Sequence, residues 1–283
     1  MKFTKELCGS RLEILIHQEW EFSDLIQECF EIGINFENKY SRFIEWNYLY
    51  TLNKDKQAII DKEFLSIIQL CLKVSDITDG YYDITIQPIL ENLWYWIEKK
   101  NNIDYNVWYK NIEINKEKIV LNNNVSLDIW SVWKWYIVDK IYNLLSEKLE
   151  KFSINFWWDI RIKWEENIRL EDPLDDTKYI GNLLLNNLSI ASSSWEKRKI
   201  HNSHHLINPK NKTSENKIQA VFIQHKLAAF SDIFATALYV SPIEKSIEIL
   251  SSVPWLEWLI IETSWKIHKS NWFNFIHNKM EWK

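Results

Sequence analysis

A short apolar segment runs directly into a helical pattern in the stretch Leu127-Asp128-Ile129-Trp130-Ser131-Val132-Trp133-Lys134-Trp135-Tyr136-Ile137-Val138-Asp139. The residues before Trp130 fit a strand, and from Trp135 onward apolar residues recur at the spacing of one helix face. We therefore predict a strand over Ser126–Ile129, a turn around Lys134 and a helix over Trp135–Leu149. A strand that leads into a helix in this way indicates a fold that combines sheets and helices.

Strand-like and helix-like segments alternate along the rest of the chain, and no segment has the composition of a linker. We expect residues 1–283 to form one domain of the α+β (mixed α/β) class, with mixed sheets flanked by helices. Further helices are predicted over Asp24–Phe43, Asp61–Val74, Ala228–Val240 and Pro242–Ser251. Strands are predicted over Phe3–Leu7, Leu12–Ile16, Ile112–Ile114, Lys118–Leu121, Ile154–Phe156, Ile168–Leu170, Leu188–Ser192, Ile218–Ile223 and Leu259–Glu262.

Tryptophan is unusually frequent and glycine unusually rare, with 17 tryptophans and 4 glycines in 283 residues. Together they make up about 7% of the chain, the ordinary share of glycine alone. Several tryptophans lie in turn-like contexts where glycine would supply positive φ or close backbone approach, as in Asn155-Phe156-Trp157-Trp158-Asp159 and Ser192-Ser193-Ser194-Trp195. We interpret most of them as glycines of the living protein, encoded by UGA codons that are read as glycine. The alternative is a tryptophan-rich carbohydrate-binding or membrane-interface protein, which would carry its indoles on exposed platforms or belts.

Composition excludes several classes of protein. The net charge is −5 and the sequence has no basic run, so we expect no nucleic-acid partner. The three cysteines have no metal-binding spacing and fit reduced thiols. No apolar stretch is long enough to span a bilayer, and no apolar signal-peptide region precedes Cys8. We therefore expect a cytoplasmic protein, with export or membrane association only if the gene start lies further upstream.

Two places in the sequence could bind a phosphate group and its metal ion. If the tryptophans beside Lys134 are glycines, a turn there can direct amide N–H groups and a helix N-terminus at an anion, with Lys134 as a point charge. The spacing matches neither the P-loop nor the dinucleotide-binding fingerprint. Asp232 and Thr236 lie four residues apart on a predicted helix, so their oxygen atoms share one face and suit Mg²⁺. The alternative is that Asp232 or Ser231 caps the helix and that Thr236 is merely exposed.

A histidine pair precedes a strand end and turn in Ser203-His204-His205-Leu206-Ile207-Asn208-Pro209. A histidine at such a place can be purely structural. It is also the side chain that most readily accepts a proton from a hydroxyl group near neutral pH. His205 is therefore a candidate base, and both interpretations stay open.

Five segments together resemble the ApbE family of FAD:protein FMN transferases once tryptophan is replaced by glycine. They follow the order of the family's motifs across nearly the whole chain: Thr78-Asp79-Gly80-Tyr81-Tyr82-Asp83-Ile84-Thr85, the stretch Leu127–Asp139 quoted above, Asn155-Phe156-Trp157-Trp158-Asp159, Ser203–Pro209 and Ser231-Asp232-Ile233-Phe234-Ala235-Thr236. The sequence departs from the family pattern at Cys8, Tyr82, Trp133 and Asn208, where the family has Met, Phe, Ala and Asp.

The resemblance implies a fold, a reaction and a set of site residues. The fold would carry an FAD cleft, and the enzyme would transfer FMN from FAD to a Ser or Thr hydroxyl of an acceptor protein, with Mg²⁺ and with release of AMP. His205 would be the catalytic base, with His204 as its rival. Asp232, Thr236 and the backbone carbonyl of Trp133 would bind Mg²⁺. FAD would be bound by Cys8, Tyr81, Tyr82, Asp83, Trp130, Lys134 and Leu206.

Two alternatives to this function stay open. The same site could serve a Mg²⁺-dependent FAD pyrophosphatase, in which water takes the place of the acceptor hydroxyl. The protein could also bind flavin without catalysis, which genuine tryptophans would favour because indoles at positions 130, 133, 135, 157, 158 and 195 would obstruct the cleft.

The glycine interpretation makes a direct prediction about the gene. We expect UGA codons at positions 133, 135, 157 and 158, because these tryptophans lie where the motifs have small residues. Nucleotide sequencing checks this, and UGG codons at these four positions would contradict the interpretation.

Overall fold

An eight-stranded antiparallel sheet runs through the structure, a computed structural model that describes residues 1–7, 9–18, 22–94, 106–157, 159–195, 199–200 and 203–277. The strand order is β1-β2-β6-β7-β10-β15-β16-β17. These strands are β1 Lys2–Leu7, β2 Ser10–Ile16, β6 Phe152–Phe156, β7 Asp159–Ile162, β10 Ser189–Ser194, β15 Ile218–His225, β16 Glu257–Glu262 and β17 Ile267–Lys269. The first four strands of this order form two hairpins, β1–β2 and β6–β7, which pair with each other through β2 and β6. The N-terminal hairpin therefore lies beside a hairpin from the middle of the sequence.

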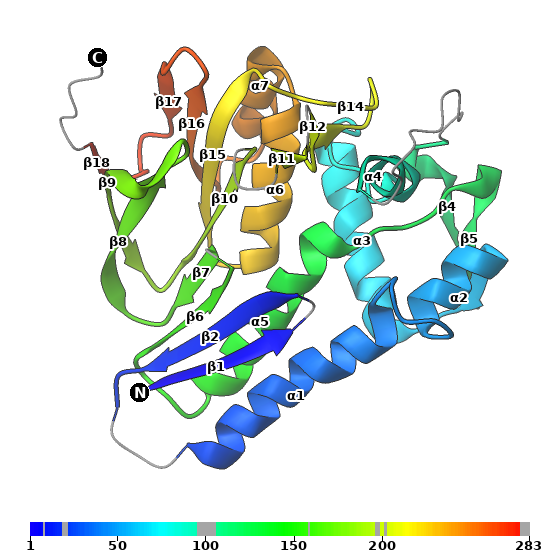
Figure 1. Cartoon of the computed structure of the whole chain (residues 1–283), viewed down its shortest axis with the longest axis horizontal. Coiled ribbons are helices and arrows are strands. Elements are labelled where there is room, and N and C mark those ends of the chain that lie inside the picture. The colour runs from blue at the N-terminus through cyan, green and yellow to red at the C-terminus, as the bar shows by residue number, and fades with distance from the viewer. Residues whose placement is uncertain are drawn as a thin grey trace.

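Two helices cover one face of this sheet (Figure 1). Helix α5 spans Trp130–Ser146 and packs on β6, while α6 spans Ala228–Val240 and packs on β10 and β15. Almost every residue of α6 is buried, because the helix is apolar all round and lies between the sheet and its neighbours. Helix α7, Ile243–Ser252, follows directly. The carboxylate of Asp139 on α5 accepts hydrogen bonds from the Ala228 and Ala229 N–H groups at the start of α6, at 2.9 and 3.1 Å.

A second, three-stranded sheet covers the opposite face. It consists of β8 Glu165–Asp172, β9 Asp175–Asn186 and β18 Phe275–His277. Between the two sheets lies a separate apolar core, which includes Leu170 and Leu183 of the small sheet and Phe222 and Leu259 of the large one. The large sheet is therefore covered on both faces, as a sheet with two apolar faces requires.

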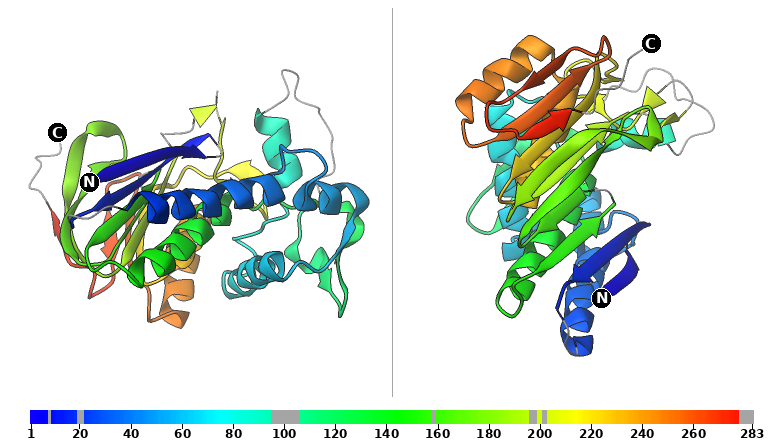
Figure 2. Two further views of the ribbon diagram at one scale, coloured as in Figure 1. Left: turned by 90° about the horizontal axis from the view of Figure 1, so that it is seen from below. Right: turned by 90° about the vertical axis from the view of Figure 1, so that its left-hand side faces the viewer.

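The remaining helices lie to one side of the large sheet. They are α1 Ser23–Tyr40, α2 Tyr48–Asp55, α3 Lys62–Ile77 and α4 Gln87–Trp94, next to a small sheet of β3 Gln57–Ile59, β4 Ile112–Ile114 and β5 Lys118–Leu121. Helix α3 begins where the Asp61 carboxylate accepts the Phe64 N–H at 2.9 Å. Figure 2 shows α1 running alongside α5. The other described elements are two short hairpins, β11 Lys199–Ile200 with β12 Ser203–His204 and β13 Ile207–Asn208 with β14 Thr213–Ser214, and two 3-10 helices, Tyr109–Asn111 and Asn122–Asn124.

The predicted fold class is confirmed, and the structure corrects the predicted bounds around the start of α5. The predicted strand Ser126–Ile129 is wrong, because only Ser126 makes a bridge, to Ile86. The predicted helix Trp135–Leu149 begins earlier, at Trp130. The Asp128 carboxylate accepts the Trp130 N–H at 2.6 Å and so ends the extended segment sooner than expected. No helix within the described ranges combines the length and apolarity needed to cross a membrane.

Three tryptophans adopt the backbone conformation that favours glycine. Trp46, Trp157 and Trp265 have φ angles of 67°, 59° and 65°. A side chain in this left-handed region costs about 1–2 kcal/mol relative to glycine. The turn geometry expected at other positions is wrong, because Trp130, Trp133 and Trp135 are helical and Trp195 lacks a positive φ.

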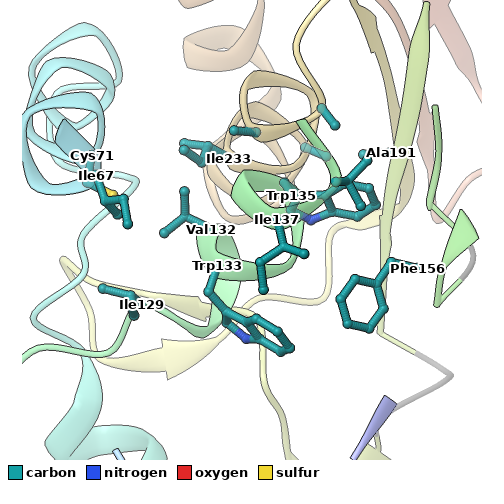
Figure 3. Packing of buried hydrophobic residues seen from close by; sticks show 14 of the residues in the cluster. Ile67, Cys71, Ile129, Val132, Trp133, Trp135, Ile137, Phe156, Ala191 and Ile233 are labelled. Carbon is teal, nitrogen blue, oxygen red and sulfur yellow. The ribbon is translucent and has the colours of Figure 1, made fainter. Parts of the chain in front are cut away.

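The tryptophans of α5 differ in another way from ordinary core residues. Trp133 and Trp135 are buried among apolar side chains such as Phe156 and Ala191 (Figure 3). Their indole Nε1 atoms have no hydrogen-bond partner among the residues that the structure describes. A buried N–H group without a partner costs about 1–3 kcal/mol. This cost is a second observation in favour of smaller residues at these positions.

We predict that Trp46→Gly is more stable than Trp46→Ala by about 1 kcal/mol, since both variants lose the indole but only glycine relieves the left-handed φ. Urea unfolding measures the difference. Trp272 is the matched control because it is equally exposed (78%, against 74% for Trp46) and is not among the residues with positive φ. At position 272, we expect the glycine variant to be no more stable than the alanine variant. A more stable glycine variant at both positions would contradict the argument from backbone conformation.

Candidate active site

A cavity of about 420 Å³ collects most of the predicted site residues, although they come from segments far apart in the sequence. Its size is within the range of small-molecule sites. The predicted residues that line it are Tyr81, Tyr82, Asp83, Trp130, Lys134, His205, Leu206, Asp232 and Thr236. Two predicted residues are not among them. Cys8 lies outside the described residues, and Trp133 lines a separate small hollow next to Phe36.

Lys134 approaches the cavity from the second turn of α5 and not from a loop. Its side chain is buried, and its Nζ lies 4.8 Å from the centre of the Trp157 ring. Trp157, which has a positive φ, lies in the turn between β6 and β7. A buried ammonium group on the cavity wall can meet an anionic oxygen of a ligand as a point charge.

Asp232 and Thr236 lie one turn apart on α6 and both line the cavity. Asp232 is buried at 9% exposure. It does not form the helix N-cap, since α6 begins four residues earlier and its first N–H groups are bound by Asp139. The capping alternative for Asp232 is therefore wrong, and its carboxylate faces the same cavity as Lys134.

The two adjacent histidines have different surroundings. His204 is buried at 2% exposure, with Nε2 2.9 Å from the Asn216 Oδ1 and Nδ1 accepting the Leu206 N–H at 3.2 Å. Burial lowers the pKa of His204, against the opposing effect of the Asn216 hydrogen bond. His205 is half-buried and lines the cavity, which His204 does not. The geometry therefore favours His205 as the histidine that can reach a ligand.

The loop after α3 carries two residues with mainly structural contacts. The Asp83 carboxylate accepts hydrogen bonds from the Thr85 N–H and hydroxyl groups and from the Tyr109 N–H, at 2.7–2.8 Å. Burial raises the pKa of Asp83 to about 6, against the effect of these hydrogen bonds. The Tyr82 hydroxyl lies 2.9 Å from the Ser131 Oγ and 3.6 Å from the Cys71 Sγ. Asp83 and Tyr82 thus fix this wall of the cavity.

Several residues that line the cavity were not predicted from the sequence. Arg42, just beyond α1, forms an ion pair with the buried Asp128 at 3.0 Å. Asp159 accepts the Ser192 N–H at 2.9 Å, and the neighbouring serines 193 and 194 also line the cavity. Asp128 and Asp159 belong to the motif segments and could have been proposed from them. The position of Arg42 depends on tertiary packing, which no local pattern reports.

Solved structures with the same fold include two ApbE proteins. The ApbE protein of Thermotoga maritima superposes with a TM-score of 0.84 at 20% identity, covering 96% of this chain and 97% of that chain. The flavin transferase ApbE of Vibrio cholerae superposes with a TM-score of 0.82 at 17% identity, covering 98% of this chain and 99% of that chain. At these identities the likeness shows the fold alone.

A sequence relative and a family model complete the comparison. The FAD:protein FMN transferase of Buchnera aphidicola is 25% identical over an alignment of 226 positions, which covers 70% of this chain and 64% of the relative. This chain therefore matches less than two thirds of that relative's length. The model of the ApbE family matches residues 8–260. Because this match covers most of the sequence, the chain belongs to the ApbE family.

Proposed function

We propose that this protein transfers FMN from FAD to a Ser or Thr hydroxyl of an acceptor protein and releases AMP. One observation carries the proposal: a single cavity brings Lys134, His205, Asp232 and Thr236 together. These residues offer a cation, a base and hard oxygen ligands, which are the groups that phosphoryl transfer needs. The names of the Buchnera and Vibrio relatives support the same activity.

The reaction exchanges one bond to phosphorus for another. The acceptor hydroxyl oxygen forms a bond to the phosphorus atom on the FMN side of the FAD pyrophosphate. The bond from this phosphorus to the oxygen shared with the AMP phosphate breaks, and AMP leaves with that oxygen. The hydroxyl proton passes to His205, which is the histidine at the cavity. Lys134, whose side chain is buried at the wall of the same cavity, would bind an anionic phosphate oxygen.

The donor chemistry of α6 fits Mg²⁺. Asp232 supplies a carboxylate oxygen and Thr236 a hydroxyl oxygen, and both are on the cavity wall. Among the described residues there is no cluster of three or more His, Cys, Asp or Glu side chains that could hold a metal alone. Such a site relies on substrate phosphates for its other ligands, as is usual for Mg²⁺. When bound there, Mg²⁺ neutralises charge on the phosphate oxygens. The contribution of the Trp133 carbonyl stays a prediction.

We predict that Asp232→Asn lowers the rate of FAD cleavage at limiting Mg²⁺ by about 10²-fold or more, because a metal ligand contributes several kcal/mol to charge stabilisation. AMP release, measured against Mg²⁺ concentration, tests this. Asp175→Asn is the control, since Asp175 is a carboxylate outside the cavity. An unchanged Mg²⁺ dependence in Asp232→Asn would contradict the assignment.

We predict that His205→Ala lowers kcat for FMN transfer by about 10²–10⁴-fold, the usual effect of losing a general base, with a much smaller change in the Kd for FAD. His204→Ala should act mainly on stability, because it removes the buried hydrogen bonds to Asn216 and Leu206. Single-turnover transfer and thermal unfolding separate the two effects. The opposite pattern, with normal transfer in His205→Ala and collapse in folded His204→Ala, would show that His204 is the base. Cleavage of FAD without transfer to any acceptor would identify a pyrophosphatase.

A further inference from the structure

The pairing between β7 and β10 stops before β10 ends. Strand β7 pairs with β10 only at Arg161 with Ser189 and at Ile160 with Ile190. Strand β10 pairs with β15 along its full length, Ser189–Ser194. Within the described part of the chain, no strand pairs with residues 191–194 on the side of β7. Among the described residues, this half of β10 is therefore an unpaired sheet edge.

The backbone at this edge points towards the gap that β7 leaves. The Ser192 N–H donates to the Asp159 carboxylate at 2.9 Å, so the backbone groups of Ser192 face the open side. Backbone N–H and C=O groups alternate between the two sides of a strand, and Ser194 therefore faces the same way. The edge offers the carbonyl of Ser192 and both backbone groups of Ser194 to an incoming strand.

The open edge joins the cavity to a groove between the two sheets. Ser192 and Ser194 line the cavity, and they also line a second hollow of about 80 Å³. The lining of this groove is mainly apolar, with Phe222 from the large sheet and Ile168 and Leu170 from β8, and it also includes the charged residues Arg169, Glu171 and Asp172. The small serine side chains leave room for another backbone to approach the edge.

We infer that an extended segment of the acceptor protein docks as an added strand on residues 192–194 of β10, with one end in the groove. This inference rests on the proposed function. The acceptor hydroxyl must reach the cavity that holds Lys134 and Asp232, and the volume of about 420 Å³ is far too small for a folded domain. An extended segment can pass along the groove, and main-chain pairing aligns it while alternate side chains occupy the apolar groove.

Backbone methylation of an acceptor peptide tests strand pairing on the unmodified protein. The probe is a mixture of synthetic nine-residue peptides with a central Thr and randomised flanks, incubated with FAD and Mg²⁺ and selected by flavin fluorescence. The best peptide is then resynthesised with a single N-methyl group at each position in turn. An added strand pairs through every second residue, so methylation should raise the peptide KM about tenfold at alternate positions and less than twofold between them.

The outcomes separate this inference from the proposed function. Alternating sensitivity supports docking on β10. A peptide KM that rises equally at all methylated positions, or at none, overturns docking on β10 while leaving FMN transfer established. Cleavage of FAD with no labelled peptide would identify a pyrophosphatase, and it would overturn both this inference and the proposed FMN transfer. A protein that neither binds nor cleaves FAD would refute the proposed function itself.

Two neighbouring residues of β8 give a matched pair of variants. Ile168 lines the groove, whereas Asn167 points to the opposite, exposed face of the strand. Ile168→Arg should raise the peptide KM about tenfold, since a long charged side chain would fill the apolar groove. Asn167→Arg introduces the same charge one residue away and should change this KM less than twofold. Equal effects of the two variants would show that charge, and not the groove, is responsible.

Discussion

The site depends on one largely buried carboxylate, that of Asp139, which joins the two helices that carry the charged groups of the site. Asp139 belongs to α5, and both of its oxygens accept N–H groups from the first turn of α6. These N–H groups lie in the protein interior, where no water would satisfy them. Burial raises the pKa of Asp139, while the two hydrogen bonds and the nearby Arg161 act in the opposite direction. The contact fixes the start of α6 against α5, and it thereby fixes Lys134 relative to Asp232.

The same contact links the helices to the sheet. Arg161 of β7 lies 3.9 Å from Asp139, and its guanidinium group stacks over the Tyr142 ring at 3.8 Å. Both Asp139 and Arg161 are largely buried, so each limits the cost of the other's charge. The turn that precedes β7 holds Trp157 against Lys134. One ionic contact in the core thus orients the helix, the strand and the turn that together form one side of the cavity.

Local patterns in the sequence were sufficient for most elements but not for their junctions. The residues of α6 and of β4 and β5 agree with the predicted bounds, because each has a clear apolar pattern. The start of α5 was misplaced because Trp130 to Trp135 were interpreted as a glycine turn, whereas the Asp128 carboxylate begins a helix there. Strand β9 was missed, since its first half is rich in charged and polar residues and hides the alternation.

The site was predictable where the motif residues act locally. The spacing of Asp232 and Thr236 placed both on one helix face, and the structure shows both at the cavity. The choice between His204 and His205 needed the structure, because successive residues of an extended segment point in opposite directions. The pairing of Arg42 with Asp128 could not be predicted, since it joins a helix end to a distant segment through packing alone.

The open edge of β10 has a consequence for solubility. An exposed edge strand usually invites pairing with another copy of the chain, and this pairing leads to aggregation. Here the unpaired half of the strand lies in the wall of a cavity, between the end of β7 and the apolar groove under β8. We expect this recess to keep out the edge strand of a second folded molecule. The backbone groups of this edge can therefore pair with an extended peptide segment without being exposed to other copies of the protein in a concentrated solution.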